Sequence, residues 1–446
     1  MKLNREYRLI AFVVAFFVNS TLAFANWPDW RGPTGDGRSD ATDLPLNWSE
    51  AENIVWKTPI HDLGHSTPVV WGDQVWLTTA TKDGRTLYAV CIDLNSGRVV
   101  HDVEVFHPNQ PQRIHLNNSY ATPSAVVEEG RAYVHYGTFG TACLDSKTGK
   151  VLWRRTDLNC EHMQGPISSP VLFDDLFILH LEGTDVQFIA ALDTTTGDTV
   201  WRWDRPQELY GHVKPVFLRK AYATPTIIEY QGRRQLISPA AEVTFSYDPK
   251  TGEELWRVCH PGWDWNAACR PIFEHGLVYL TTGVSKHLLA VRPSGTGDVT
   301  DTHVTWSTRK FVPNMSSPLI VDDLLFMVSD QGYAPCLEAK TGREFWRQRL
   351  RAGGDHWASP LYTDGKIYFS GKKGVVSVIS AAKDFQLLAE NGLDASFIAS
   401  PAVAGNAIIL RSLTNLYCIA EDYETAPQSE IAGKPKPEPS TKVERI

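Results

Sequence analysis

Aromatic and histidine side chains recur just before a short phrase that ends in proline. His65, Tyr120, Tyr222 and Trp357 lie three residues before such a proline, and His356 lies four residues before one. Aromatic rings stack on flat groups, and imidazole nitrogens bind metals or exchange protons. We therefore expect a site for a polar ligand, a flat cofactor or a metal. The candidate ligand-binding residues are His65, Tyr120, His162, Tyr222, Glu242, His356 and Trp357.

Three further carboxylates fall in predicted turns. Glu182, Asp185 and Asp330 are weak candidates for metal ligands, because hard cations prefer carboxylate oxygens. The alternative is that they form a solvated face and that the loop histidines are simply hydrated. Cys-x-x-Cys, G-x-S-x-G and H-E-x-x-H motifs are absent from the sequence, so zinc, thiol redox and common hydrolase chemistry have no motif behind them.

Composition limits the class of protein. The 446 residues are 43% hydrophobic and 21% charged, which is typical of a globular chain. The net charge of −8 lacks the basic footprint of a nucleic-acid binder. Fifteen tryptophans together with 32 glycines favour a repeated all-β unit over helices.

The first 25 residues have the pattern of a secretory signal. Basic residues precede an apolar run over residues 9–18, and an A-x-A site at residues 23–25 predicts cleavage after Ala25. A run of this length is too short to span a bilayer, which takes about 20 residues. We expect a periplasmic or secreted protein with no membrane span after cleavage. An uncleaved N-terminal anchor is the alternative.

Two phrases recur along the chain. The first, small or hydroxyl residues followed by proline and an apolar strand, occurs eight times at intervals of about 40 to 55 residues. Its prolines are Pro68, Pro123, Pro170, Pro225, Pro271, Pro318, Pro360 and Pro401. The second phrase has an Asp or Glu, then Thr-Gly, then Trp, and we expect its tryptophans to pack between neighbouring repeats. These repeat tryptophans, with one that precedes the first repeat, are Trp56, Trp153, Trp201, Trp256, Trp306 and Trp346.

Each repeat predicts four short strands. In the sixth copy they are residues 319–321, 324–328, 334–339 and 344–348. A four-stranded sheet cannot bury both faces alone, whereas sheets packed around an axis can. The last copy has three strands, and an unassigned strand at residues 53–58 precedes the first. We therefore predict an all-β, eight-bladed β-propeller with four antiparallel strands per blade, in which the N-terminal strand completes blade eight and removes the exposed edge.

These units define the expected domain organisation. Residues 1–25 are the signal peptide, 26–52 an N-terminal extension, 53–423 the propeller, and 424–446 a disordered tail rich in Pro, Lys and Glu.

The seven cysteines divide into two groups. Those in one strand position of the repeat are expected to be buried as small apolar residues: Cys91, Cys143, Cys336 and Cys418. Cys160, Cys259 and Cys269 fall in predicted loops. Cys259 and Cys269 are either bridged or free.

The second phrase resembles the PQQ-type (quinoprotein) repeat. Together with residues 26–33 and 295–300, it is most similar to exported single-propeller proteins of planctomycetes, and more distantly to the BamB-like scaffold and the quinoprotein alcohol dehydrogenases. The resemblance covers about residues 27–421 and implies the fold. It does not fix the function. The dehydrogenases' adjacent-cysteine disulfide is missing, and their Glu, Asn and Asp ligands cannot be matched here.

Two functions follow from this pattern. The first is a binding scaffold that presents a loop-rich face to a protein, glycan or small ligand, without chemistry of its own. The alternative, implied by the resemblance, is a PQQ-dependent alcohol or sugar dehydrogenase. In that case the quinone would stack near Trp357, and a Ca²⁺ would be held by Glu182, Asp185, Glu242 or Asp330.

Overall fold

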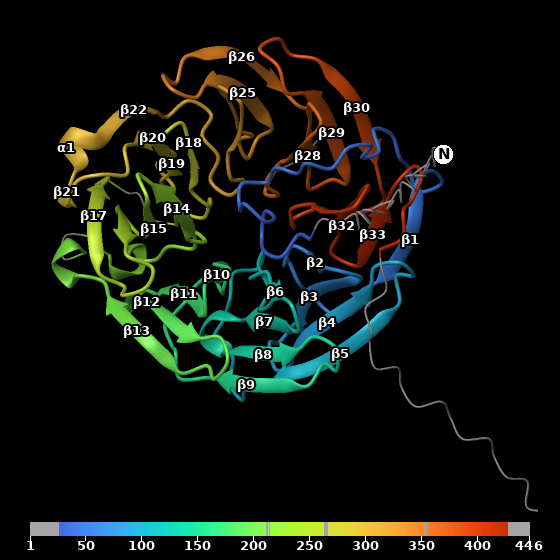
Figure 1. Cartoon of the computed structure of the whole chain (residues 1–446), viewed down its shortest axis with the longest axis horizontal. Helices are drawn as coiled ribbons and strands as arrows, with labels where there is room; N and C mark the ends of the chain where they lie inside the picture. Colours follow the sequence, from blue (N-terminus) through green and yellow to red (C-terminus); the bar gives the residue numbers. More distant parts are fainter. Residues whose placement is uncertain (1–25, 211–212, 214, 263–265, 352–354, 427–446) are drawn as a thin grey trace, which may run out of the picture.

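The computed structural model describes residues 26–210, 213, 215–262, 266–351 and 355–426. The predicted signal peptide and residues 427–446 of the predicted tail lie outside the described residues. Eight sheets surround one axis, in chain order from blue to red in Figure 1. Every sheet has four antiparallel blade strands, so the predicted eight-bladed all-β propeller is confirmed. Within the described residues, no helix is long and apolar enough to cross a bilayer.

Seven blades are built from consecutive segments. Blade 1 holds β2 (Val69–Trp71), β3 (Gln74–Ala80), β4 (Leu87–Asp93) and β5 (Val99–Phe106). Blade 2 holds β6 (Val126–Glu128), β7 (Arg131–His135), β8 (Thr141–Asp145) and β9 (Val151–Arg155). Blade 3 holds β10 (Val171–Phe173), β11 (Leu176–Glu182), β12 (Gln187–Asp193) and β13 (Thr199–Asp204). Blade 4 holds β14 (Thr226–Tyr230), β15 (Arg233–Pro239), β16 (Val243–Tyr247) and β17 (Glu254–Cys259).

The second half repeats the pattern. Blade 5 holds β18 (Ile272–Glu274), β19 (Leu277–Thr281), β20 (Leu288–Val291) and β22 (Val304–Thr308). Blade 6 holds β23 (Leu319–Val321), β24 (Leu324–Phe326), β25 (Tyr333–Glu338) and β26 (Glu344–Arg349), within two residues of the predicted strands. Blade 7 holds β27 (Leu361–Thr363), β28 (Lys366–Ser370), β29 (Val375–Ser380) and β30 (Leu387–Gly392). An insertion in blade 5 forms α1 (Thr300–His303) and β21 (Gly297–Asp298), which pairs parallel to β17.

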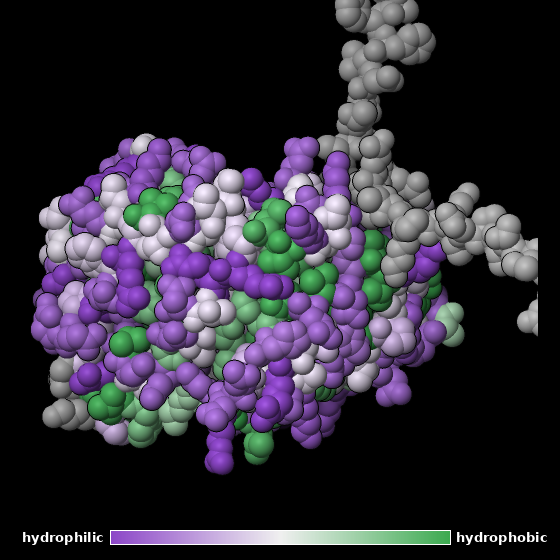
Figure 2. Space-filling model, turned by 90° about the horizontal axis from the view of Figure 1, so that it is seen from below, coloured by the Kyte–Doolittle hydropathy of each residue, from purple (hydrophilic) through white to green (hydrophobic). Residues whose placement is uncertain are grey.

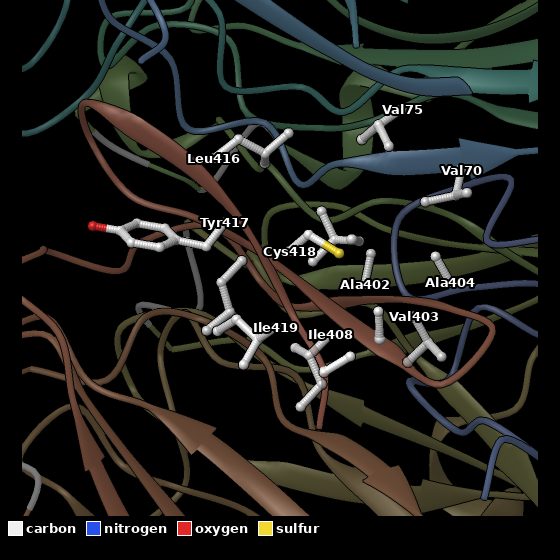
Figure 3. Close-up of a cluster of buried hydrophobic side chains, with 14 of the residues drawn as sticks. Val70, Val75, Ala402, Val403, Ala404, Ile408, Leu416, Tyr417, Cys418 and Ile419 are labelled. Carbon is white, nitrogen blue, oxygen red and sulfur yellow. The ribbon is translucent and has the colours of Figure 1, made fainter. Parts of the chain in front are cut away.

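Blade 8 joins the two ends of the propeller. Its strands are β31 (Ala402–Ala404), β32 (Ala407–Arg411) and β33 (Asn415–Ile419), and β1 (Ile54–Pro59) pairs antiparallel with β33. Trp56 lies opposite Cys418 in this register. Buried side chains of blade 8 pack beside Val70 and Val75 of blade 1 (Figure 3). The predicted closure by the N-terminal strand is therefore confirmed.

Most repeat tryptophans bind the turn of the following blade. The indole N–H of Trp153 donates to the carbonyl of Thr194 at 3.0 Å, and its ring lies over Gly197. The same arrangement links Trp56 to Leu94, Trp201 to Pro249, Trp306 to Ala339 and Trp346 to Ala382. The Thr-Gly and Trp of the repeated phrase are thus two halves of one inter-blade contact.

In two blades a glutamine side chain, instead of the tryptophan, donates the hydrogen bond to a turn carbonyl of the next blade. Trp256 donates to Gln235 of its own blade, and the Gln235 amide donates to the carbonyl of Pro293 in blade 5. In blade 1, Gln74 bonds Trp76 and donates to the carbonyl of Ser146 in blade 2.

Each repeat tryptophan lies in the fourth strand of its blade, opposite a small residue of the third strand. Cys143 pairs with Trp153 and Cys336 with Trp346, in the same relation as Cys418 and Trp56. These cysteines and Cys91 are buried, which confirms the expectation for this group. Cys259 and Cys269 are both free thiols rather than a bridged pair.

In the view of Figure 2, the outer surface shows no continuous hydrophobic area. Hydrophilic side chains dominate, and hydrophobic ones stand in several separate groups. Exposed apolar residues on the outer strands, such as Val200 and Trp203 of β13, are normal for a soluble surface.

A glycine pair isolates the contribution of the tryptophan–turn contact. Gly197 and Gly232 share a φ of +76°, but a Cβ on Gly197 would lie 2.7 Å from the Trp153 ring, whereas one on Gly232 meets nothing within 4 Å. We expect Gly232→Ala to lower the free energy of unfolding by about 1 kcal/mol through backbone strain. Gly197→Ala should cost about 2 kcal/mol more, because the indole must move. Urea unfolding measures both, and equal losses would contradict the role of this contact.

Candidate functional site

The residues before each blade proline form two layers around the axis. This segment is extended, so alternate side chains point to opposite sides. In every blade except blade 2, the residue three positions before the blade proline faces the central channel, and in four blades so does the residue one position before it. The layer nearer the opening contains one residue from each blade: His65, Thr122, Ile167, Tyr222, Ala268, Met315, Trp357 and Ile398. Each lies three positions before the blade proline, except Thr122, which lies three positions before Ala125. We call it the upper ring.

The deeper layer is a ring of hydroxyl residues. Seven blades supply the axial hydroxyl ring: Thr67, Ser124, Ser169, Thr224, Ser317, Ser359 and Ser400. Each lies one position before the blade proline, except Ser124, which precedes Ala125. The backbone N–H of Thr67 donates to Ser124 Oγ, that of Ser124 to Ser169 Oγ, and so on around the axis at 2.9–3.1 Å. Blade 5 interrupts the ring with Arg270, whose N–H donates to Ser317 Oγ.

The N-terminal extension closes the far end of the channel. Residues 27–37, here called the plug, touch the inner strands or axial residues of six blades. Trp27 pairs with Val70 of blade 1, and the Trp30 indole donates to Ser400 Oγ of blade 8 at 3.3 Å. Arg270 holds Asp29 through two guanidinium nitrogens at 3.1 Å and also bonds the carbonyl of Trp30. In Figure 1 the blue N-terminal segment reaches the centre of the ring.

The remaining contacts of the plug continue around the axis. Arg31 donates to the carbonyl of Pro318 in blade 6, the carbonyl of Gly37 accepts from Tyr362 in blade 7, and that of Pro28 accepts from Val127 in blade 2. Because Trp30 lies under the axial hydroxyl ring, the channel is a pocket open at one end.

The open end has two connected parts. A funnel of about 370 Å³ lies at the face that carries the inter-blade loops. Below it, a throat of about 70 Å³ lies among five members of the axial hydroxyl ring, with Trp30 also in its lining. Beyond the upper ring, the funnel is lined by His115, Asn117, Asn118, Gln164, Asn266, Asn314, Asp330 and Asp355.

The charged groups at the funnel are already paired. Lys286 Nζ lies 2.6 Å from Asp330, and Lys372 Nζ lies 3.9 Å from Asp355. Lys372 also sits 3.7 Å from the centre of the Trp357 ring. Among the described residues, the two carboxylates that line the opening are therefore balanced by lysines.

Four of the sequence-derived candidates meet at this pocket. His65, Tyr222 and Trp357 occupy the upper ring, and Asp330 lies on the funnel wall. Burial, together with the nearby cations Arg411 and Lys372, lowers the pKa of His65 to about 4. His65 is therefore a neutral imidazole at neutral pH.

Tyr120 and His356 lie elsewhere because of their register. The structure places Ser124-Ala125 of blade 2 where other blades have their hydroxyl-Pro pair, so Pro123 precedes the equivalent position by two residues. Tyr120 is consequently buried against Gly84 and Phe139, and Thr122 takes the upper-ring position. His356 stands one residue off the upper-ring position and is buried beside Gly332.

His162 supports the pocket from behind. Its Nε2 accepts the N–H of Thr138, and its carbonyl accepts the Tyr222 hydroxyl at 2.7 Å. Burial lowers the pKa of His162 to about 4. His162 thus positions an upper-ring residue rather than lining the cavity.

The remaining carboxylate candidates are separate from the funnel. Glu182 forms a fully buried ion pair with Arg205 at 2.7 Å, and burial raises the pKa of Glu182 to about 7 despite this partner. Asp185 accepts the N–H of Glu161, and Glu242 is a buried turn residue with φ of 60°.

The described residues do not fit a quinone site with a metal ion. Among them, no group of three or more His, Cys, Asp or Glu side chains is placed to hold a metal. We therefore derive no redox step for this pocket.

The members of the two rings other than His65, Tyr222 and Trp357 were missed by sequence reasoning. Ile167, Met315 and Ile398 are apolar and looked like core residues, and Thr122 was hidden by the shifted proline. Counting back from the inner strand rather than from the proline would have found them.

Comparison with known proteins supports the architecture. A family model described as outer membrane protein assembly factor BamB matches residues 46–201, 91–232 and 239–412. A search of curated protein sequences gives no match.

Solved structures show the same fold at low identity. BamB from Moraxella catarrhalis is 13% identical, with a TM-score of 0.59 over 82% of this chain and 99% of that one. Quinohemoprotein alcohol dehydrogenase from Comamonas testosteroni is 12% identical, with a TM-score of 0.66 over 91% and 82% of the two chains. A europium-containing methanol dehydrogenase is 11% identical, with a TM-score of 0.67 over 88% and 90%.

Buried histidines predict acid sensitivity. Burial lowers the pKa to about 4 for His65 and His162, to about 3 for His135, and well below its usual value for His180. The unfolded chain takes up these protons below about pH 6.5 and the folded protein does not, so stability is lost as pH falls from 6.5. The raised pKa of Glu182 acts in the opposite sense between about pH 7 and 4.5, with one proton against four.

We expect the free energy of unfolding to fall between pH 6.5 and 5, with a net uptake of up to about three protons. Urea unfolding across this range measures the slope. His162→Gln, which retains an acceptor for Thr138, should reduce the uptake by about one proton. An unchanged slope in His162→Gln would refute this assignment.

Proposed function

This chain belongs to the BamB-like PQQ-repeat family, and we propose that it is an exported, non-catalytic binding scaffold whose funnel takes a small polar ligand or part of a glycan. The observation that carries the proposal is the pocket itself. Polar and aromatic side chains converge on a cavity that is open at one end and sealed at the other by the plug. Such concave sites with a few convergent polar groups are typical of ligand binding.

Several features support binding without chemistry. The imidazole of His65 is neutral, the carboxylates of Asp330 and Asp355 are paired with lysines, and Trp357 and Tyr222 offer aromatic surface. Export to the periplasm or the medium rests on the signal-like residues 1–25. The likeness of residues 26–33 to the opening of exported planctomycete single-propeller proteins adds to it.

The family match supports a scaffold role more than an enzymatic one. BamB is described as an assembly factor, whereas the dehydrogenases share the fold at 11–12% identity. Protein partners would meet the loops that surround the funnel, because these loops form the most irregular face of the ring.

A pair of tryptophan variants tests the funnel. The mature protein is screened by ligand-observed NMR against mono- and oligosaccharides, amino acids and short peptides. We expect at least one class to bind, and Trp357→Ala to weaken it by about tenfold or more through loss of stacking. Trp203→Ala, on an outer strand, should bind as the wild type does.

Two results would contradict the proposal. One is the absence of binding by every compound, or equal binding by both tryptophan variants. The other is reduction of a dye by an alcohol after the protein is mixed with PQQ and Ca²⁺, which would favour the dehydrogenase function.

A further inference from the structure

The hydroxyl groups of the throat have an unused hydrogen-bonding capacity. A serine or threonine hydroxyl has one donor hydrogen and two acceptor lone pairs. Each member of the axial hydroxyl ring accepts a backbone N–H from the preceding blade or from Arg270. Among the described residues, none of these hydroxyls donates to a protein acceptor.

Five of these donors converge on the throat. Thr67, Ser124, Ser169, Thr224 and Ser400 line it, whereas Ser317 and Ser359 do not. A group that accepts several hydrogen bonds from different directions satisfies such a ring, and a carboxylate has two oxygens that accept about four. The throat is thus chemically matched to a carboxylate.

A buried cation next to the throat adds to this match. Arg411 is 2% exposed, and its guanidinium bonds the carbonyl of Thr78 and both oxygens of Ser66, which precedes the ring member Thr67. All these acceptors are neutral, and no carboxylate among the described residues pairs with Arg411. An anion in the throat would compensate this charge in a region of low dielectric constant.

The funnel above the throat offers hydrogen-bond acceptors and apolar surface, so its ligand should have hydrogen-bond donors and an apolar face. Asn266 and Asn314 line the funnel, and their side-chain oxygens are buried and accept no hydrogen bond from the described residues. Trp357, Met315 and Ile398 supply apolar surface in the adjoining upper ring. A sugar ring offers both hydroxyl donors for the amides and C–H faces for the indole.

We propose that the pocket binds an acidic saccharide, with the carboxylate of a uronic acid among the axial hydroxyls and its sugar ring against Trp357 in the funnel. This inference rests on the proposed binding function and specifies its ligand class. The five throat hydroxyls then have two roles, because each oxygen joins neighbouring blades and each hydrogen is available to the ligand.

Ligand charge provides a test that leaves the protein unchanged. Calorimetric titrations of the mature protein use trigalacturonate, its methyl ester and neutral maltotriose. We expect trigalacturonate to bind about tenfold tighter than its ester, because hydrogen bonds to a charged group are the stronger ones. Equal affinity for the acid and the ester would overturn the inference while leaving the proposed function in place.

Two serine variants separate binding from blade cohesion. Ser169→Ala removes a throat hydroxyl, and Ser359→Ala removes one with the same backbone contact outside the throat. Both should lose similar stability, but only Ser169→Ala should lose most of the preference for the acid over the ester. Loss of that preference in both variants, or in neither, would overturn the assignment.

Titration with a peptide tests whether the ligand is a saccharide. N-acetyl-dialanine carries a carboxylate without a sugar ring. Tighter binding of this peptide than of trigalacturonate, with the same dependence on Ser169, would overturn the saccharide. Failure of every probe, neutral and acidic, would count against the proposed binding function itself.

Discussion

The contact on which this molecule depends is a backbone N–H that finds its acceptor on the side chain of the next blade. It occurs at the start of the inner strands, where Thr67, Ser124 and Ser169 follow one another around the axis. An inner strand of three residues has little sheet of its own, so its leading N–H needs a partner outside the blade. The hydroxyl that meets this need must point inward, and the composition of the channel wall follows from it.

The outer parts of neighbouring blades are joined by a different contact, which also runs from one blade to the next. Trp153 binds the turn of blade 3, and where the tryptophan is absent or turned, Gln74 or Gln235 reaches the equivalent carbonyl. In blade 7, which has Ala389 at this position, the N-terminal extension supplies Trp48, whose ring stacks on Tyr368 and whose backbone N–H donates to Asn391. The indole N–H of Trp48 makes no hydrogen bond to the described residues, so Trp48 replaces the missing tryptophan in packing alone. In blades 1 and 4 the exchange keeps the hydrogen bond to the turn carbonyl of the next blade, which the tryptophan makes elsewhere.

Sequence reasoning reached the architecture because it depends on repeated local patterns. Proline at strand starts, Thr-Gly turns and the leading strand with Trp56 each specify one element, and together they give eight blades. The site was harder to predict, since its residues are one per blade and differ in type. His65 and Trp357 stood out by chemistry, whereas Ile398 has no feature that separates it from the core. His356, one residue from Trp357, faces the opposite side because an extended chain alternates.

The pairing of β1 with β33 has a further consequence for how the chain is made. Pro59 of β1 lies opposite Asn415 of β33. About 350 residues must therefore be synthesised after β1 before its partner strand exists. Until β33 is made, β1 has no partner strand, even if the blades between them have already folded. Closure of the ring therefore waits until β33 has been made, and the contact of Trp30 in the plug with Ser400 can form only once the chain has reached blade 8.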